Sequence, residues 1–262
     1  MNNLSNNKKL VFLIHGYNNT GESASLALEK LRVEVIKKFP HEKFQFVEVY
    51  WDGLTKRDNP LNSTTIWNNA QYSSSMAGLG LRKILINIKN KENYVITHSH
   101  GASVITEALF NVRRFDDKYY ITNYNGKEIA NLQAIYNTPT SKFSVGMLAP
   151  AIPGYNVFHE YYDRTVEGSS VVTTMTNYRF VNGFNKYDVA TTKGFLAGSF
   201  GATTLACRED DHLAVQAFFK NDSKIYSRIN FSEDKNNKQR SHAVVAYIEN
   251  PNFNTFLISV IE

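Results

Sequence analysis

Tyr94-Val-Ile-Thr-His-Ser-His-Gly-Ala-Ser103 is the stretch that decides how the rest of the chain is interpreted. Its first half is rich in β-branched and aromatic residues, which indicates a strand, and its second half consists of small residues that lead into a helical pattern over 102–112. Ser99 would then occupy the tight turn between a strand and a helix. That position exposes a nucleophile, and small neighbours let the helix pass close to the sheet.

This turn also predicts electrostatic help for a reaction, because the N-terminus of the following helix directs N–H groups and positive potential at developing negative charge. The pattern departs from Gly-x-Ser-x-Gly at its first position, where Thr97 replaces glycine. A second match to small-x-Ser-x-Gly surrounds Ser199, but no convincing strand precedes it. Ser99 is therefore the predicted nucleophile and Ser199 the alternative.

Strand-like and helix-like stretches alternate on both sides of this turn. Such alternation predicts βαβ units and an α/β fold, with a mostly parallel sheet of about six strands flanked by helices on both faces. Ligands of such sheets bind at the carboxyl ends of the strands. We expect residues 1–262 to form a single domain. The expected strands are Lys9–Ile14, Lys43–Trp51, Asn93–Thr97, Phe143–Leu148, Val171–Arg179 and Lys224–Phe231, and the expected helices are Glu22–Phe39, Trp67–Ile88, Ala102–Val112 and a C-terminal segment from about His242, interrupted at Pro251.

Composition excludes several classes of protein. A hydrophobic share of 42% with 20% charged residues is ordinary for a globular chain, and the formal charge of +5 is too small and too scattered to indicate nucleic-acid binding. A single cysteine, Cys207, excludes an internal disulfide and fits a reducing compartment. No stretch is apolar enough for a transmembrane segment or a signal-peptide core. We expect a cytoplasmic location, with export that needs no leader as the alternative.

The first expected strand ends in Ile14-His-Gly-Tyr-Asn-Asn19, which favours an oxyanion-binding loop. Gly16 allows the chain to turn sharply and to expose a backbone N–H. Tyr17 is the predicted owner of that N–H, and His100, which follows the nucleophile, is the predicted second donor. The alternative is a loop without catalytic meaning.

The His-Gly-Tyr-Asn opening and the Thr-His-Ser-His-Gly turn resemble the α/β-hydrolase superfamily, and more narrowly its esterase- and lipase-like bacterial members. The resemblance implies a Ser-His-Asp triad in the chain order nucleophile, acid, histidine, with no cofactor. It places the base in the loop after the last strand, where His242 lies, and the acid just beyond the preceding strand, where Asp188 lies. The alternative acids are Asp163, Asp210 and Asp211.

Three further histidines, His15, His98 and His100, raise the question of a metal centre. Residues that flank the serine of such a turn point to different sides, and no carboxylate has the spacing of a ligand, so no metal site is predicted. We expect His98 to pack beneath the turn and His100 to line the pocket. Asp52, at the end of the second strand, is expected to cap a loop.

Two segments do not fit the alternation of strands and helices. Asn125-Gly126 lies between β-prone arms and predicts a two-residue hairpin. The segment 190–208 is rich in Gly, Thr and Ala and receives no assignment. Whether 116–131 or 190–208 acts as a lid is left open, as is the role of the aromatic segment 154–162, which would either pack on the body or contact substrate.

The predicted function is that of a serine hydrolase that cleaves carboxylic esters through an acyl-enzyme, acting on a small-molecule or lipid ester. One alternative keeps the triad and takes a membrane phospholipid as substrate, as an exported lipase would. The other is a binding module with a hydrolase fold and no activity. The sequence sets neither the acyl length, nor the alcohol, nor the oligomeric state.

Overall fold

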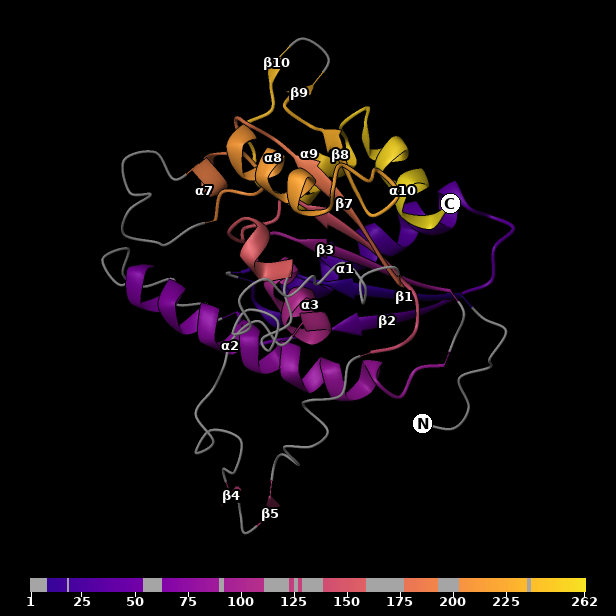
Figure 1. Ribbon diagram of the computed structural model, residues 1–262, viewed down its shortest axis with the longest axis vertical. Coiled ribbons are helices and arrows are strands. Elements are labelled where there is room, and N and C mark those ends of the chain that lie inside the picture. The colour runs from indigo at the N-terminus through magenta and orange to yellow at the C-terminus, as the bar shows by residue number, and fades with distance from the viewer. Residues whose placement is uncertain are drawn as a thin grey trace.

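The computed structural model describes residues 9–17, 19–53, 63–89, 92–110, 123–124, 127–128, 139–158, 177–192, 203–234 and 237–262. Within these ranges six strands form one sheet in the order β2-β1-β3-β6-β7-β8, and every neighbouring pair is parallel (Figure 1). The prediction of an α/β fold with a sheet of about six mostly parallel strands is confirmed. The strands are β1 (Lys9–Ile14), β2 (Phe44–Val49), β3 (Asn93–His98), β6 (Phe143–Leu148), β7 (Tyr178–Phe184) and β8 (Tyr226–Asn230).

Helices cover both faces of the sheet, and successive residues of β1 show how. Leu10, Phe12 and Ile14 belong to one hydrophobic cluster, whereas Val11 and Leu13 belong to another, because side chains alternate along a strand. The first cluster is completed by α2 (Ser63–Leu85), α3 (Gly101–Phe110), η2 (Tyr155–Phe158) and α8 (Glu209–Phe218), and the second by α1 (Gly21–Lys38), α9 (Val244–Ile248) and α10 (Phe253–Ile261).

Two local features set the position of the second helical layer. Thr20 caps α1 by accepting a hydrogen bond from the Ser23 N–H at 3.1 Å, which satisfies one of the free donors at the helix start. Gly146 of β6 leaves room for α10, because a Cβ there would lie 2.5 Å from Val260 Cγ2 and 2.6 Å from Phe256 Cζ. The C-terminal helix can therefore lie directly on the sheet.

The expected strand over Val171–Arg179 ends five residues too early. The structure begins β7 at Tyr178 and continues it through Phe184, while 171–176 lie outside the described residues. Asn182 and Gly183 suggest a loop, but the Asn182 side chain donates to the Leu205 carbonyl at 3.1 Å and to the Tyr226 hydroxyl at 3.0 Å. These tertiary contacts therefore keep Asn182 in the strand, although asparagine is disfavoured in strands.

The hairpin expected around Asn125-Gly126 is confirmed, since β4 (Asn123–Tyr124) pairs with β5 (Lys127–Glu128) in antiparallel fashion. A second small hairpin, of β9 (Glu233–Asp234) and β10 (Asn237–Lys238), has no counterpart in the sequence-based expectations. Most of 116–131 and residues 193–202, the two segments considered as a lid, lie outside the described residues. Among the described helices, none has the length and apolar character needed to cross a membrane.

Candidate active site

Ser99 lies between the last residue of β3 and the first residue of α3, as the sequence predicts. Its φ of 55° is in the left-handed region, which is strained for a residue with a side chain. Backbone bonds hold this conformation: the Ser99 N–H donates to the Leu148 carbonyl at 2.9 Å, and its carbonyl accepts from the N–H groups of Ala102 and Ala151, each at 3.2 Å. The turn is thus tied to the neighbouring strand and to its own helix.

Glycines allow the close contact between this turn and the loop after β1. A Cβ on Gly101 would lie 2.6 Å from the His15 carbonyl oxygen, and one on Gly16 would lie 2.8 Å from Ser99 Cβ. Real Cβ atoms do not approach other atoms this closely, so both positions need glycine for lack of space. The glycines at these two positions are therefore required by the close approach of the two loops.

The three residues predicted to form the triad lie together, although they come from three separate parts of the chain. His242, in the loop between β10 and α9, places Nε2 2.7 Å from Ser99 Oγ and Nδ1 2.7 Å from Asp188 Oδ2. The carboxylate only accepts, so the ring proton is on Nδ1. Nε2 is then the acceptor for the serine hydroxyl, which is the arrangement a general base requires.

Asp188 is fully buried at the start of α7 (Val189–Thr192), beyond the end of β7. Its Oδ1 accepts from the N–H groups of Ala190 at 2.9 Å and Thr191 at 3.1 Å, while Oδ2 accepts from the Tyr247 hydroxyl at 2.6 Å as well as from His242. Burial alone would raise the pKa of Asp188, but these hydrogen bonds, that from His242 first, hold the pKa below its ordinary value. The carboxylate is therefore ionised at neutral pH.

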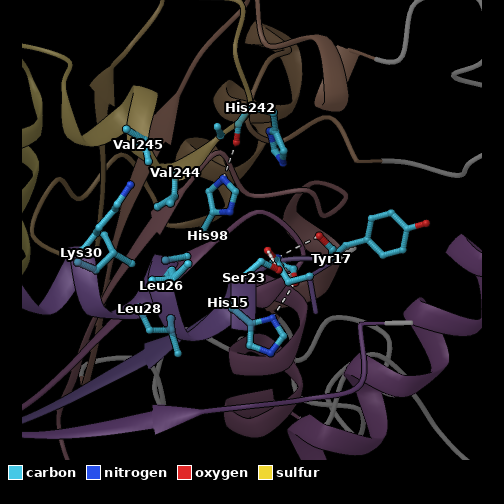
Figure 2. Close-up of a pocket in the computed structure, with 15 residues that line it drawn as sticks. His15, Tyr17, Ser23, Leu26, Leu28, Lys30, His98, His242, Val244 and Val245 are labelled. Carbon is cyan, nitrogen blue, oxygen red and sulfur yellow. Dashed lines mark hydrogen bonds between the residues drawn. The ribbon is translucent and has the colours of Figure 1, made fainter. Parts of the chain in front are cut away.

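His98 holds the backbone of His242 in place. Its Nε2–H donates to the carbonyl oxygen of His242 at 2.8 Å, and the two rings lie 4.8 Å apart (Figure 2). Burial lowers the pKa of His98 to about 3, with a further contribution from the nearby His242. His98 is consequently neutral at physiological pH and ties β3 to the loop that carries His242.

Acid is expected to destabilise the fold through His98. Burial lowers its pKa to about 3 from an ordinary value of 6.5, so between these pH values the unfolded chain binds a proton that the folded chain does not. Protonation of His98 in the unfolded chain therefore does not lower the stability of the fold above about pH 6.5. Below that pH it does so progressively, as the pH falls toward 3. His98→Gln, which keeps a donor for the His242 carbonyl but does not titrate, is expected to lose about 1–2 kcal/mol less stability between about pH 7 and about pH 4.5 in urea denaturation.

His212 provides an internal reference for this measurement, because burial lowers its pKa to about 4 and both proteins contain it. Both are therefore expected to lose some stability in acid, and the difference between them reports on position 98. An equal loss in native protein and variant would show that His98 does not drive the acid sensitivity.

His15 fixes the peptide that carries the predicted oxyanion donor. The Trp51 backbone N–H donates to His15 Nε2 at 3.1 Å, so the ring proton is on Nδ1, which donates to the Gly16 carbonyl at 2.8 Å. The indole N–H of Trp51 in turn donates to the His15 carbonyl at 2.8 Å. Because the Gly16–Tyr17 peptide is trans, holding its carbonyl on one side directs the Tyr17 N–H to the other.

The side chain of His100 is buried among aromatic residues and lies outside the groove described below. Its Nδ1 bonds to the Ala151 carbonyl at 3.0 Å and its Nε2 to the Ser74 hydroxyl at 3.0 Å. Trp67 and Trp51 pack against the ring, with centroids 4.7 and 5.9 Å away. The ring thus joins α2 to the serine turn, so the expectation that it lines the pocket is wrong for the groove that the structure describes.

Several alternatives from the sequence can also be placed. Ser199 and Asp163 lie outside the described residues. Asp210 and Asp211 lie in the first turn of α8, and the Nδ1 of His242 bonds to Asp188 instead. Asp52 is exposed in the loop after β2.

The described residues near Ser99 and His242 include neither a cluster of metal ligands nor an ionised thiol. Among the residues that the structure describes, no group of three or more His, Cys, Asp and Glu side chains is arranged to hold a metal ion. Cys207 is buried, and this burial raises the pKa of its thiol to about 11, so the thiol stays protonated at neutral pH.

A groove of about 360 Å³ opens beside His242, between α1 and the segment that starts at this residue. Figure 2 shows Leu26 and Lys30 of α1 on one side and Val244 and Val245 of α9 on another, with His98 near His242. This volume is within the range of small-molecule sites. The residues that line the groove are His15, Gly16, Tyr17, Asn19, Ser23, Leu26, Ala27, Leu28, Lys30, Leu31, His98, His242, Ala243, Val244 and Val245.

Sequence reasoning missed two residues that hold Asp188 and His242 in place. Tyr247 reaches Asp188 from α9, and its hydroxyl also accepts from the Asn185 side chain at 3.2 Å. His98 was expected only to pack beneath the turn, without its bond to the His242 carbonyl. Both contacts join residues far apart in the chain, so no local signal could have indicated them.

Comparisons with known proteins found no matching family model and no matching curated relative. Two solved structures are similar at low identity. An iodinated complex of acetyl xylan esterase is 9% identical over 97% of this chain and 99% of its own, with a TM-score of 0.37. An esterase of Pyrococcus furiosus is 11% identical over 98% of this chain and 85% of its own, with a TM-score of 0.41.

Proposed function

We propose that this protein is a serine hydrolase that cleaves carboxylic esters, with Ser99 as nucleophile, His242 as general base and acid, and Asp188 as the orienting carboxylate. The observation that supports this most strongly is the continuous relay from Ser99 Oγ to His242 Nε2 and from His242 Nδ1 to Asp188 Oδ2, with 2.7 Å at each step. A serine hydroxyl is a weak nucleophile alone and becomes reactive through such a base.

In the acylation step, Ser99 Oγ forms a bond to the ester carbonyl carbon while its proton passes to His242 Nε2. The carbonyl oxygen becomes an oxyanion, which the backbone N–H groups of Tyr17 and His100 would stabilise. Collapse of this intermediate breaks the bond to the alcohol oxygen, which leaves with the proton from His242. Asp188 stays ionised and stabilises the imidazolium during this exchange.

Deacylation uses the same groups in the same order. His242 removes a proton from water, the hydroxide oxygen bonds to the acyl carbon, and the carboxylic acid leaves as Ser99 recovers its proton. No cofactor takes part in either half of the reaction. The relay also argues against a binding module without activity, because Asp188 is buried in an ionised state that a passive module has no need to maintain.

The test is covalent labelling by a fluorophosphonate, which reacts with activated serines. The native protein is expected to gain one adduct that maps to the peptide containing Ser99, and protein denatured before the treatment is expected to gain none. His242→Ala removes the base and is expected to abolish labelling without unfolding the chain. An adduct on Ser199, or no adduct on folded native protein, would refute the assignment.

A further inference from the structure

Apolar side chains of α1 and α9 line part of the groove beside the triad. Leu26 of α1 and Val244 and Val245 of α9 lie around it (Figure 2), and Ala27 of α1 also lines it. Such a surface suits a short hydrocarbon segment, because the removal of apolar groups from water is favourable.

Among the described residues that line the groove, Lys30 is the one lysine, arginine, aspartate or glutamate. Within the part of the chain that the structure describes, no carboxylate lies within 4 Å of its ammonium nitrogen, and the neighbouring acids on α1 pair elsewhere: Glu29 with Arg32 and Glu34 with Lys37. Burial lowers the pKa values of His15 and His98, so these histidines add no charge at neutral pH. The groove therefore combines an apolar wall with a single positive charge.

The position of the groove relative to the reacting groups decides which arm of an ester would enter it. The alcohol oxygen must lie against His242 Nε2 to receive its proton, and the oxyanion must lie against the loop of Gly16 and Tyr17. The acyl substituent takes the remaining tetrahedral direction, away from both. Since His242, Gly16 and Tyr17 all line the groove, the alcohol arm is the one that reaches it.

We propose that the substrate is an ester whose alcohol arm is apolar next to the ester bond and carries an anionic group, a carboxylate or a phosphate, at its far end. The apolar part lies between α1 and α9, and the anion pairs with Lys30. This inference rests on the proposed function and adds to it the chemical class of the alcohol. Because Lys30 is exposed, the pair is expected to change KM about two- to fivefold and to leave kcat unchanged.

The experiment compares ω-acetoxyhexanoate with ω-acetoxyhexanamide, which have the same shape and differ in charge. Native protein is expected to show a KM about two- to fivefold lower for the anionic ester. Lys30→Gln is expected to remove this preference and Lys30→Glu to reverse it, both measured as the ratio of the KM values for the two esters within each variant. Lys37→Gln is the matched control, since Lys37 lies on the same helix outside the groove and is expected to leave the preference intact.

A second pair of substrates, monoethyl adipate and ethyl adipamate, places the charge on the acyl arm instead. Equal KM values for the two members of this pair support the assignment to the alcohol arm, and a preference for monoethyl adipate that Lys30→Gln removes would overturn it. Equal KM values for the two acetoxy esters, or a preference that survives in Lys30→Gln, would overturn the proposed anion site. Protein that reacts with fluorophosphonate at Ser99 and shows either result retains the proposed function and loses only this inference, whereas unlabelled protein loses both.

Discussion

Replacing Ser99 by alanine is expected to lower kcat for ester hydrolysis about a million-fold while leaving the fold intact. The hydroxyl is the atom that would bond to the acyl carbon, and no neighbouring group in the relay can take its place. Alanine must adopt the same φ of 55° and meets the same backbone strain, so the free energy of unfolding should change by less than about 1 kcal/mol. Steady-state kinetics on a short-chain ester and urea denaturation measure the two quantities.

Ser103→Ala is the matched control for this variant. Ser103 lies four positions further along, in α3, and its hydroxyl accepts a hydrogen bond from Ser74 at 3.1 Å outside the relay. Its removal is expected to change kcat less than about threefold. A Ser99→Ala protein that keeps more than about one percent of native turnover would show that another group acts as the nucleophile.

The serine turn was predictable because its signals are local. The β-branched residues that precede Thr97, and the glycine that follows His100, each constrain the backbone within a few positions of Ser99. The parallel sheet was predictable for a related reason, since the alternation of strand and helix patterns leaves few ways to bury both faces.

The position of β7 was not predictable from local preferences. Gly183 lies against β6, where a Cβ would be 3.0 Å from the Met147 carbonyl oxygen and 3.2 Å from Leu148 Cα. Gly183 therefore allows close contact with β6, and Asn182 bonds to the segment around Leu205. Without these neighbours, the two residues indicate a loop.

Within the site, the predicted chain order guided the choice of Ser99, Asp188 and His242, but the residues that support them depend on tertiary structure. Asp188 and Tyr247 are separated by 59 positions, and their bond forms only because α9 follows the His242 loop directly. His98 reaches the His242 carbonyl over 144 positions. A tyrosine in a helical pattern and a histidine at the end of a strand carry no sign of such partners.

Asp188→Asn is expected to lower kcat about 10⁴-fold although the substitution is nearly isosteric. The N–H groups of Ala190 and Thr191 both donate to Oδ1, so the amide must keep its oxygen on that side. Its NH₂ group then takes the place of Oδ2 and donates to His242 Nδ1. The ring proton moves to Nε2, and Ser99 faces a donor where it needs an acceptor.

Asp210→Asn provides the control, because Asp210 is an exposed carboxylate on α8 that the sequence left open as a candidate acid. Its kcat is expected to stay within about twofold of native. The Asp188→Asn protein should also react with fluorophosphonate far more slowly than native protein, since labelling needs the same activated serine. If the asparagine variant kept kcat within tenfold of native while the Asp210 variant lost it, the carboxylate that orients His242 during the reaction would have to be assigned to α8 and not to Asp188.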